Sequence, residues 1–192
     1  VQKFKELEAN SSTRLGGIIS QVEKRITKDK KAWARVLIED LDGSLEVLVF
    51  PETYGRYQAQ LIKDTAILVC GDVSRRDEPP KLVAQEIYPL ADAPRYFATK
   101  LSLHLSVTTT EPHKMEKIKD ILRMHPGVTP VVICMEHPGG QKVFVEAASA
   151  LRVFPDEELV HKLEQESGEK SVYIAVNPSP CLTAKRKKWG EN

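Results

Sequence analysis

The stretch "RITKDKKAWARVLIEDLDGSLEVLVFP", residues 25–51, begins as a basic run and continues as an alternating apolar segment. Alternation with a period of two is typical of a strand with one buried face. Asp42-Gly43 is a hairpin turn signal, and the alternation resumes after it. The inward positions are Ala34, Val36, Ile38, Leu45, Val47 and Val49, and the outward positions of the first strand are Trp33, Arg35, Leu37 and Glu39. This stretch predicts a β-hairpin whose outer face carries aromatic and basic side chains.

The segments around this hairpin complete a five-stranded pattern within residues 13–90. A first strand over 14–26 contains Gly16-Gly17, which indicates a bulge or a bend. Pro51 opens a short helix-like stretch. Two further strands are expected over 65–73 and 81–88. Three strands, one helix and two strands is the order of an OB-fold, a five-stranded Greek-key barrel that binds oligonucleotides on its second and third strands.

The basic residues of this predicted barrel gather around two loops, residues 27–31 and 74–80. Residues 13–90 hold 12 Lys/Arg and 12 Asp/Glu, and the local placement of charge matters more for binding than this neutral total. Lysines neutralise phosphates, and an aromatic ring or a guanidinium plane stacks on a base. The predicted nucleic-acid-binding residues are Lys24, Arg25, Lys28, Lys30, Lys31, Trp33, Arg35, Arg75, Arg76 and Lys81.

Two other interpretations of these segments remain open. The loop 27–31 would look much the same if it were a solvated hairpin loop and Trp33 packed on a neighbouring domain. Glu39, Asp40 and Asp42 form an acidic cluster of the kind that holds Mg²⁺ for nuclease chemistry, but the simpler reading is a turn in which Asp40 bonds its own loop backbone. We predict no catalytic residues and no cofactor.

The cysteines and histidines do not predict a metal site. Cys70, Cys134 and Cys181 are far apart and outside any Cys-x-x-Cys spacing, and the five histidines fit no zinc motif. Free cysteines in apolar runs favour a reducing, intracellular setting. No run reaches the roughly 18 apolar residues of a membrane span and no signal peptide opens the chain, so we expect a cytoplasmic protein without membrane contact. Because the chain starts at Val1, we expect it to be a piece of a longer protein.

The rest of the chain predicts a second, small α+β domain over residues 100–178. Its expected order is β-α-β-β-β-α-β, with strands over 101–107, 129–135, 141–147, 151–154 and 171–176 and helices over 112–125 and 155–167. An apolar stripe at helical spacing marks the first helix, and Gly168 is a C-cap signal for the second. The remaining segments are predicted to be linkers, residues 1–12 and 91–99, and a basic tail, residues 179–192 with Lys185–Lys188.

The run "GGIISQVEKRITKDKKAWARVLIEDLDGSLEVLVFPETYGRY", residues 16–57, resembles the OB domain of the bacterial replicative DNA polymerase III α subunit. So does "ILVCGDVSRRDEPPKLVAQEIYPL", residues 67–90. The shared features are a Gly-Ile-Ile start, Ile-Thr-Lys in the loop, Val-Phe-Pro-Glu, and a Gly-x-Val-Ser-x-Arg-Asp-Glu run. The resemblance continues more weakly through "ILRMHPG" and "RVFPDEELVHKLEQESGE", which are similar to the C-terminal domain of that subunit.

This resemblance implies that the barrel holds the single-stranded template and that residues 100–178 dock the clamp-loader τ subunit. It also implies contact with the rest of the α subunit and a place at the bacterial replisome. The catalytic aspartates of this DNA-directed DNA polymerase, a transferase, sit in a palm domain that this chain lacks, so the chain alone is not expected to polymerise DNA. One departure is Lys30, where the family loop usually carries Gly. A tRNA-binding OB module and a purely protein-binding module remain alternatives.

Overall fold

The computed structural model describes residue 4 and residues 6–182 of the chain. The chain forms two compact units, Val1–Ala91 with Ser179–Asn192, and Asp92–Pro178. The predicted basic tail at Lys185–Lys188 lies outside the described residues. Of the described helices, none is both long and apolar enough to cross a membrane.

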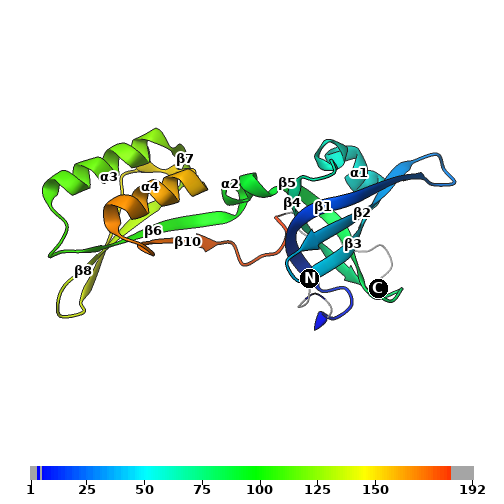
Figure 1. The fold of residues 1–192 in the computed structure, drawn as a ribbon, viewed down its shortest axis with the longest axis horizontal. Helices are drawn as coiled ribbons and strands as arrows, with labels where there is room; N and C mark the ends of the chain where they lie inside the picture. The colour runs from blue at the N-terminus through cyan, green and yellow to red at the C-terminus, as the bar shows by residue number, and fades with distance from the viewer. Residues whose placement is uncertain (1–3, 5, 183–192) are drawn as a thin grey trace, which may run out of the picture. The chain divides into compact units, whose positions relative to one another are not determined.

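The first unit is a closed five-stranded barrel with the strand order β1-β2-β3-β5-β4, seen in Figure 1. The predicted OB-fold is therefore confirmed. The parallel pair β3 and β5 closes the barrel, and a short helix lies between β3 and β4, as expected. The elements are β1 Ser12–Ile26, β2 Ala32–Asp40, β3 Gly43–Val49, α1 Pro51–Tyr57, η2 Gln58–Gln60, β4 Ala66–Ser74 and β5 Lys81–Pro89.

Strand β1 bends so that it serves two neighbours. Its first half, residues 12–18, pairs with β4, and its second half, residues 18–26, pairs with β2, with a register shift between Ile19 and Gln21. At Gly17 the backbone of β2 comes so close that an added Cβ would lie 2.8 Å from the carbonyl oxygen of Glu39. Glycine is needed at this position because no side chain fits at the contact.

Alternation along the strands builds the barrel core, because every second side chain points inward. The inward residues of β2 and β3 are buried, as predicted. Phe4 is also only 2% exposed and belongs to this core. Leu7 also packs against this core, so the segment before β1 is not only a linker, and two packed apolar residues in a short polar segment are too few to show a reliable period.

The second unit is a four-stranded sheet with the order β10-β6-β8-β9. Helices α3 and α4 lie together on one face of the sheet in Figure 1, and their apolar stripes join the sheet in one core cluster. The predicted α+β class is confirmed. The elements are β6 Ala98–Ser106, α3 Pro112–Met124, β7 Pro126–Thr129, β8 Val131–Glu136, β9 Lys142–Glu146, η4 Ser149–Leu151, α4 Glu157–Ser167 and β10 Val172–Val176.

Three predicted segments differ from the structure. Residues 151–154 do not form a sheet strand, because Val153 makes only isolated bridges to Pro126 and Thr129 after the turn of η4. The predicted linker 91–99 is mostly helical, with η3 Leu90–Asp92 and α2 Ala93–Phe97, since Pro94 is well tolerated in a first helical turn.

The third difference is the start of the predicted tail. Residues 179–182 return to the barrel, where Cys181 is buried. The backbone N–H of Leu182 donates to the carboxylate of Glu86 on β5 at 2.9 Å. These residues therefore belong to the first unit.

Candidate nucleic-acid interface

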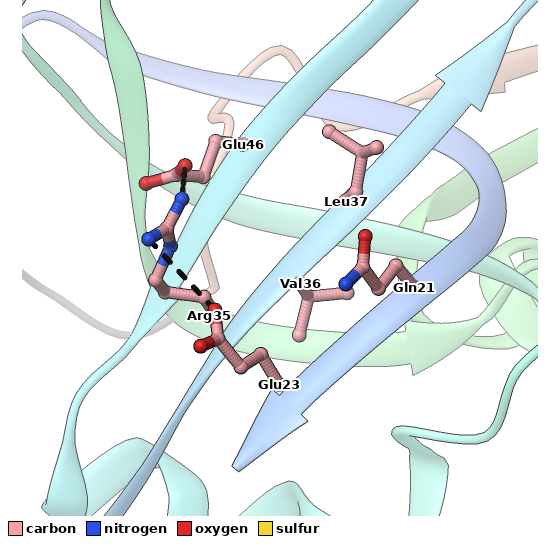
Figure 2. A pocket seen from close by; sticks show the side chains of 6 residues that line it. All are labelled: Gln21, Glu23, Arg35, Val36, Leu37 and Glu46. Carbon is pink, nitrogen blue, oxygen red and sulfur yellow. Dashed lines mark hydrogen bonds and ion pairs between the residues drawn. The ribbon is translucent and has the colours of Figure 1, made fainter. Parts of the chain in front are cut away.

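The outer face of β1, β2 and β3 brings the predicted strand residues together. Across β1 and β2, Arg25 lies opposite Trp33 and Glu23 lies opposite Arg35. A pocket of about 140 Å³ opens on this face, lined by the residues in Figure 2: Gln21, Glu23, Arg35, Val36, Leu37 and Glu46. This is the face that OB-folds use for oligonucleotides.

An aromatic pair lies at the loop end of this face. The Trp33 ring stacks with that of Phe50 at a centroid distance of 6.1 Å and an interplanar angle of 29°. The guanidinium carbon of Arg25 lies 5.8 Å from the centroid of the Trp33 ring. Phe50 is 45% exposed and Trp33 is partly exposed, so a base can reach the pair mainly over Phe50.

The sequence interpretation missed Phe50 because it placed the turn one residue too late. Asp40 pairs with Gly43, so the turn is Leu41-Asp42 rather than Asp42-Gly43. A turn centred on Asp42-Gly43 would have placed Trp33 opposite Glu52. The available signal was the alternation itself, because Phe50 continues the outward positions of β3.

The middle of the face is balanced in charge. Figure 2 shows Arg35 between two carboxylates: its Nη2 donates to Glu46, and its Nη1 lies 3.8 Å from an oxygen of Glu23. The Nζ of Lys81 lies 3.0 Å from Glu46 and 3.1 Å from Asp77. Arg35 and Lys81 were predicted to face DNA, but both already have carboxylate partners on the barrel.

These contacts shift the pKa values of Glu46 and Lys81. Partial burial raises the pKa of Glu46, but hydrogen bonds from Lys81 and Arg35 outweigh it and hold that pKa below its usual value. The pKa of Lys81 is raised by Glu46 first and by Asp77 second. Both shifts favour the charged forms of Glu46 and Lys81, so the contact between them is an ion pair.

The loop between β1 and β2 is an ordered turn with exposed ammonium groups. The N–H of Lys31 donates to the hydroxyl of Thr27 at 3.1 Å, and the N–H of Lys30 donates to the Thr27 carbonyl at 3.0 Å. Lys30 has a φ of 59°, so it keeps the left-handed conformation that glycine adopts most readily. Lys28, Lys30 and Lys31 are exposed.

The other predicted basic residues divide into two groups. Within the described residues, no carboxylate pairs with the side chains of Lys24, Lys28, Lys30, Lys31 or Arg76. Arg25 pairs with Glu23 at 2.7 Å. Arg75 donates through Nε to the carbonyl of Leu7 at 2.9 Å and lies 3.9 Å from Glu78. The first group is therefore the better candidate for phosphate contacts.

The acidic cluster that suggested a nuclease is built as a turn. One oxygen of Asp40 accepts the N–H groups of Asp42 at 2.8 Å and of Gly43 at 3.1 Å. Among the described residues, the side chains that lie close enough to share a metal ion do not include Glu39, Asp40 or Asp42. The geometry is that of a side chain that closes its own turn.

Comparison with known proteins supports the fold and the resemblance. The family model of the OB-fold nucleic acid binding domain matches residues 13–90. DNA polymerase III subunit alpha of Mycobacterium tuberculosis strain H37Rv is 29% identical over 156 residues, which cover 81% of this chain and 13% of that protein. The same subunit of Vibrio cholerae is 26% identical over 171 residues, which cover 88% of this chain and 15% of that protein. The chain therefore spans only a small part of these relatives.

Solved structures that match part of this chain include the mitochondrial single-stranded DNA binding protein Rim1 of S. cerevisiae. It is 18% identical, and the match covers 43% of this chain and 96% of that chain with a TM-score of 0.35. A domain of replication protein A from Methanococcus maripaludis is 17% identical, with coverages of 44% and 89% and a TM-score of 0.37. Similarity this low carries no argument about function. The sequence relatives confirm the resemblance: this chain contains an OB-fold nucleic-acid-binding domain similar to that of DNA polymerase III subunit alpha.

Proposed function

We propose that this chain is the non-catalytic C-terminal part of a bacterial replicative polymerase α subunit and that its barrel holds single-stranded template DNA. The observation that carries this proposal is the stacked pair of the partly exposed Trp33 and the exposed Phe50. It lies beside a loop whose lysines have no carboxylate partner among the described residues. A stacking surface next to ammonium groups is the combination that single-stranded nucleic acid requires. The protein would act in the bacterial cytoplasm, at the replisome.

The proposed strand runs from the loop 27–31 across the aromatic pair. Phosphates contact Lys28, Lys30 and Lys31, and one or two bases stack on Trp33 and Phe50. Duplex DNA should bind more weakly, because its bases are already stacked on each other. The paired charges of Arg35 and Glu46 favour a supporting role over a phosphate contact.

The test is the salt dependence of single-stranded DNA binding by the full chain, measured by fluorescence anisotropy. Phosphate contacts of Lys28, Lys30 and Lys31, with a fourth from Arg76 on the other basic loop, predict a log–log slope of about −2.8, from roughly −0.7 per contact. Replacing Lys28, Lys30 and Lys31 with Ala removes three contacts and should leave a slope of about −0.7. The matched control replaces Lys114, Lys117 and Lys119 on α3 with Ala, which should leave the slope unchanged.

Three results would contradict the template proposal. If the loop variant binds with the parent's affinity and slope, the loop is only a solvated hairpin. If tRNA displaces single-stranded DNA at lower concentration than unlabelled DNA does, the barrel is a tRNA-binding module. If the parent binds nucleic acid with no dependence on salt, the basic loop does not contact phosphates.

We propose further that residues 100–178 dock the clamp-loader τ subunit, as the family resemblance implies. Strand β9 supports a protein partner, because it lies at the edge of the sheet and all five of its residues are exposed. Val143, Phe144 and Val145 are each about half exposed or more, at 49%, 64% and 51%. An exposed apolar edge strand is a common place for another chain to pair.

A pull-down of the full α subunit with the C-terminal region of τ tests this docking. The parent should bind τ, and Phe144→Asp on β9 should weaken binding. Tyr173→Ala on β10, which is 53% exposed at the opposite edge of the sheet, is the control and should bind normally. Failure of the folded parent to bind τ would refute the docking role, and normal binding by the Phe144 variant would exclude β9 as its site.

A further inference from the structure

Two thiols and a carboxylate meet inside the first unit, where no proposed DNA contact reaches. They are Cys70 on β4, Glu86 on β5 and Cys181 in the returning segment, and they are 0%, 0% and 9% exposed. Their two sulfur atoms and a carboxylate oxygen all lie within 4.8 Å of one another. Among the described residues, this is the one group of His, Cys, Asp and Glu side chains close enough to share a metal ion.

Three segments of the chain, β4, β5 and residues 179–182, position the three side chains. Cys70 and Glu86 are direct partners in the antiparallel register of β4 and β5. Cys181 comes from a distant part of the chain, and its carbonyl accepts the hydroxyl of Ser179 at 2.9 Å. The next residue, Leu182, donates its N–H to one oxygen of Glu86 at 2.9 Å. The carboxylate is thus oriented by a backbone donor, as metal-binding carboxylates usually are.

The spacing suits a tetrahedral cation. Zinc binds sulfur at about 2.3 Å and carboxylate oxygen at about 2.0–2.2 Å, so tetrahedral ligands are about 3.8 Å apart for two sulfurs and about 3.5 Å apart for sulfur and oxygen. The three ligand atoms already lie within 4.8 Å of one another. Only a small contraction of the cluster is needed to bring them to these separations.

The charges also suit a divalent cation. Two thiolates balance the charge of one divalent ion, so binding with release of the two thiol protons adds no net charge to the buried site. The pKa of Cys70 is raised by its hydrogen bond with Cys181, by burial and by Glu86, while the Arg14 guanidinium acts in the opposite direction. This arginine supplies a positive charge near the site that remains after the metal binds.

We propose that Cys70, Glu86 and Cys181 bind one zinc-like divalent cation, with water as the fourth ligand. The ion would tie the segment 179–182 to the barrel. A donor set of two thiolates and one carboxylate suits zinc and cobalt and does not suit magnesium or calcium, which prefer oxygen ligands. The proposal does not depend on DNA binding, because none of the three residues lies on the face of β2 and β3.

Cobalt(II) titration of the reduced, chelator-treated full chain tests the site. One equivalent of Co²⁺ should produce a thiolate-to-cobalt charge-transfer band with the visible spectrum of a tetrahedral ion, and Zn²⁺ should displace it. Native mass spectrometry of the parent should show one metal bound with the loss of two protons. Zinc should also raise the thermal unfolding temperature of the parent.

The variants assign the ligands. Cys70→Ser and Cys181→Ser should each abolish the thiolate band, and Glu86→Gln should weaken metal affinity by at least about tenfold. Cys134→Ser is the matched control, since Cys134 is a buried thiol of the second unit and its loss should change nothing. Circular dichroism checks that each variant is folded.

Several outcomes would overturn the proposal. One is a parent that takes up no metal in native mass spectrometry, a result that needs no variant to fold. Another is a band that survives in a folded Cys70 or Cys181 variant. A third is a protein that forms a Cys70–Cys181 disulfide in air and, after the disulfide is reduced again, binds no Co²⁺, because the pair would then be a redox pair and not a metal site.

Discussion

At the scale of single residues, the outer face of the barrel carries three classes of side chain: aromatic rings that can stack on bases, exposed charges, and charges that are held in ion pairs. Trp33 and Phe50 form the aromatic surface, while Lys28 and its loop neighbours carry exposed charges. Arg35 is held by Glu46 and Glu23. Each class should respond differently to substitution, because stacking releases no counterions and phosphate neutralisation does.

Trp33→Ala should weaken single-stranded DNA binding by about 1–3 kcal/mol at every salt concentration and leave the salt slope unchanged. Phe50→Ala should act in the same way, because the two rings share one surface. Binding isotherms at several salt concentrations measure both quantities. The control Tyr173→Ala removes an exposed aromatic of the second unit and should have no effect. A change of slope without a loss of affinity at low salt would contradict the stacking role.

Lys30 allows the charge of the loop to be separated from its conformation. Its φ of 59° costs a non-glycine residue about 1 kcal/mol or more. Lys30→Gly should therefore be as stable as Lys30→Ala or more stable, by up to about 1 kcal/mol in the free energy of unfolding. Denaturant unfolding of the two variants measures this difference. Both variants lose one charge, so both should reduce the salt slope of DNA binding by the same amount, roughly 0.7. A Lys30→Gly variant that is less stable than Lys30→Ala would show that the loop does not hold this conformation in solution.

At the scale of elements, one carboxylate links three strands of the barrel. Glu46 on β3 contacts Arg35 on β2 and Lys81 on β5. β3 and β5 are the parallel pair that closes the barrel, with only two registered residue pairs. The ion pairs of Glu46 therefore reinforce the place where the backbone ladder is shortest.

The pH dependence of stability should show this contribution of Glu46. Its pKa in the folded chain is lowered from an ordinary value of 4.5, so its ion pairs stabilise the fold above that value and are lost as the pH falls through the folded pKa. Between about pH 5 and pH 3 the parent should lose more stability than Glu46→Gln, which has no proton to take up. Urea unfolding at a series of pH values measures the difference.

The control for this experiment is Glu39→Gln, at the exposed end of β2. Among the described residues, Glu39 makes no ion pair, so this variant should follow the pH dependence of the parent. If Glu46→Gln also follows the parent curve, the pairs with Arg35 and Lys81 contribute nothing to the closure of the barrel.

At the scale of the whole molecule, the first unit is discontinuous in sequence. Residues 1–91 form the barrel, and the segment from Ser179 returns to it after the second unit. This return places Cys181 beside Cys70 and supplies a hydrogen bond to the buried Glu86. Since a buried carboxylate without its donor is costly, the barrel depends on residues distant in the chain.

A fragment of residues 1–91 should therefore be less stable than the same residues joined by a flexible linker to residues 179–192. The expected difference is about 1–3 kcal/mol for the lost donor to Glu86, with a further loss from exposure of β4. Residues 92–178 alone should fold independently, and limited proteolysis of the full chain should cut near the unit boundaries at 91–92 and 178–179 before it cuts inside either unit. Equal stability of the two barrel fragments would show that the return segment is not part of the folded unit.

The sequence by itself determined the fold class of both units. Period-two alternation in residues 32–49, the bend signal at Gly16-Gly17 and the start of a helix at Pro51 are local signals, and each reports the conformation of its own segment. Together they place the elements in the order of an OB-fold. The basic loop could also be predicted, because a cluster of lysines between two strand patterns is visible in the sequence without knowledge of any tertiary contact.

Only the tertiary structure decided which side chains meet. Alternation gives the face on which a side chain lies but not its neighbour on the next strand, and a one-residue error at the turn of the hairpin hid the contact between Trp33 and Phe50. The pairing of Arg35 and Lys81 with Glu46, the burial of Phe4 and the meeting of Cys70 with Cys181 depend on contacts between distant segments. Such contacts leave no period or spacing in the sequence, because the closure of the barrel, and not the order of the residues, brings them together.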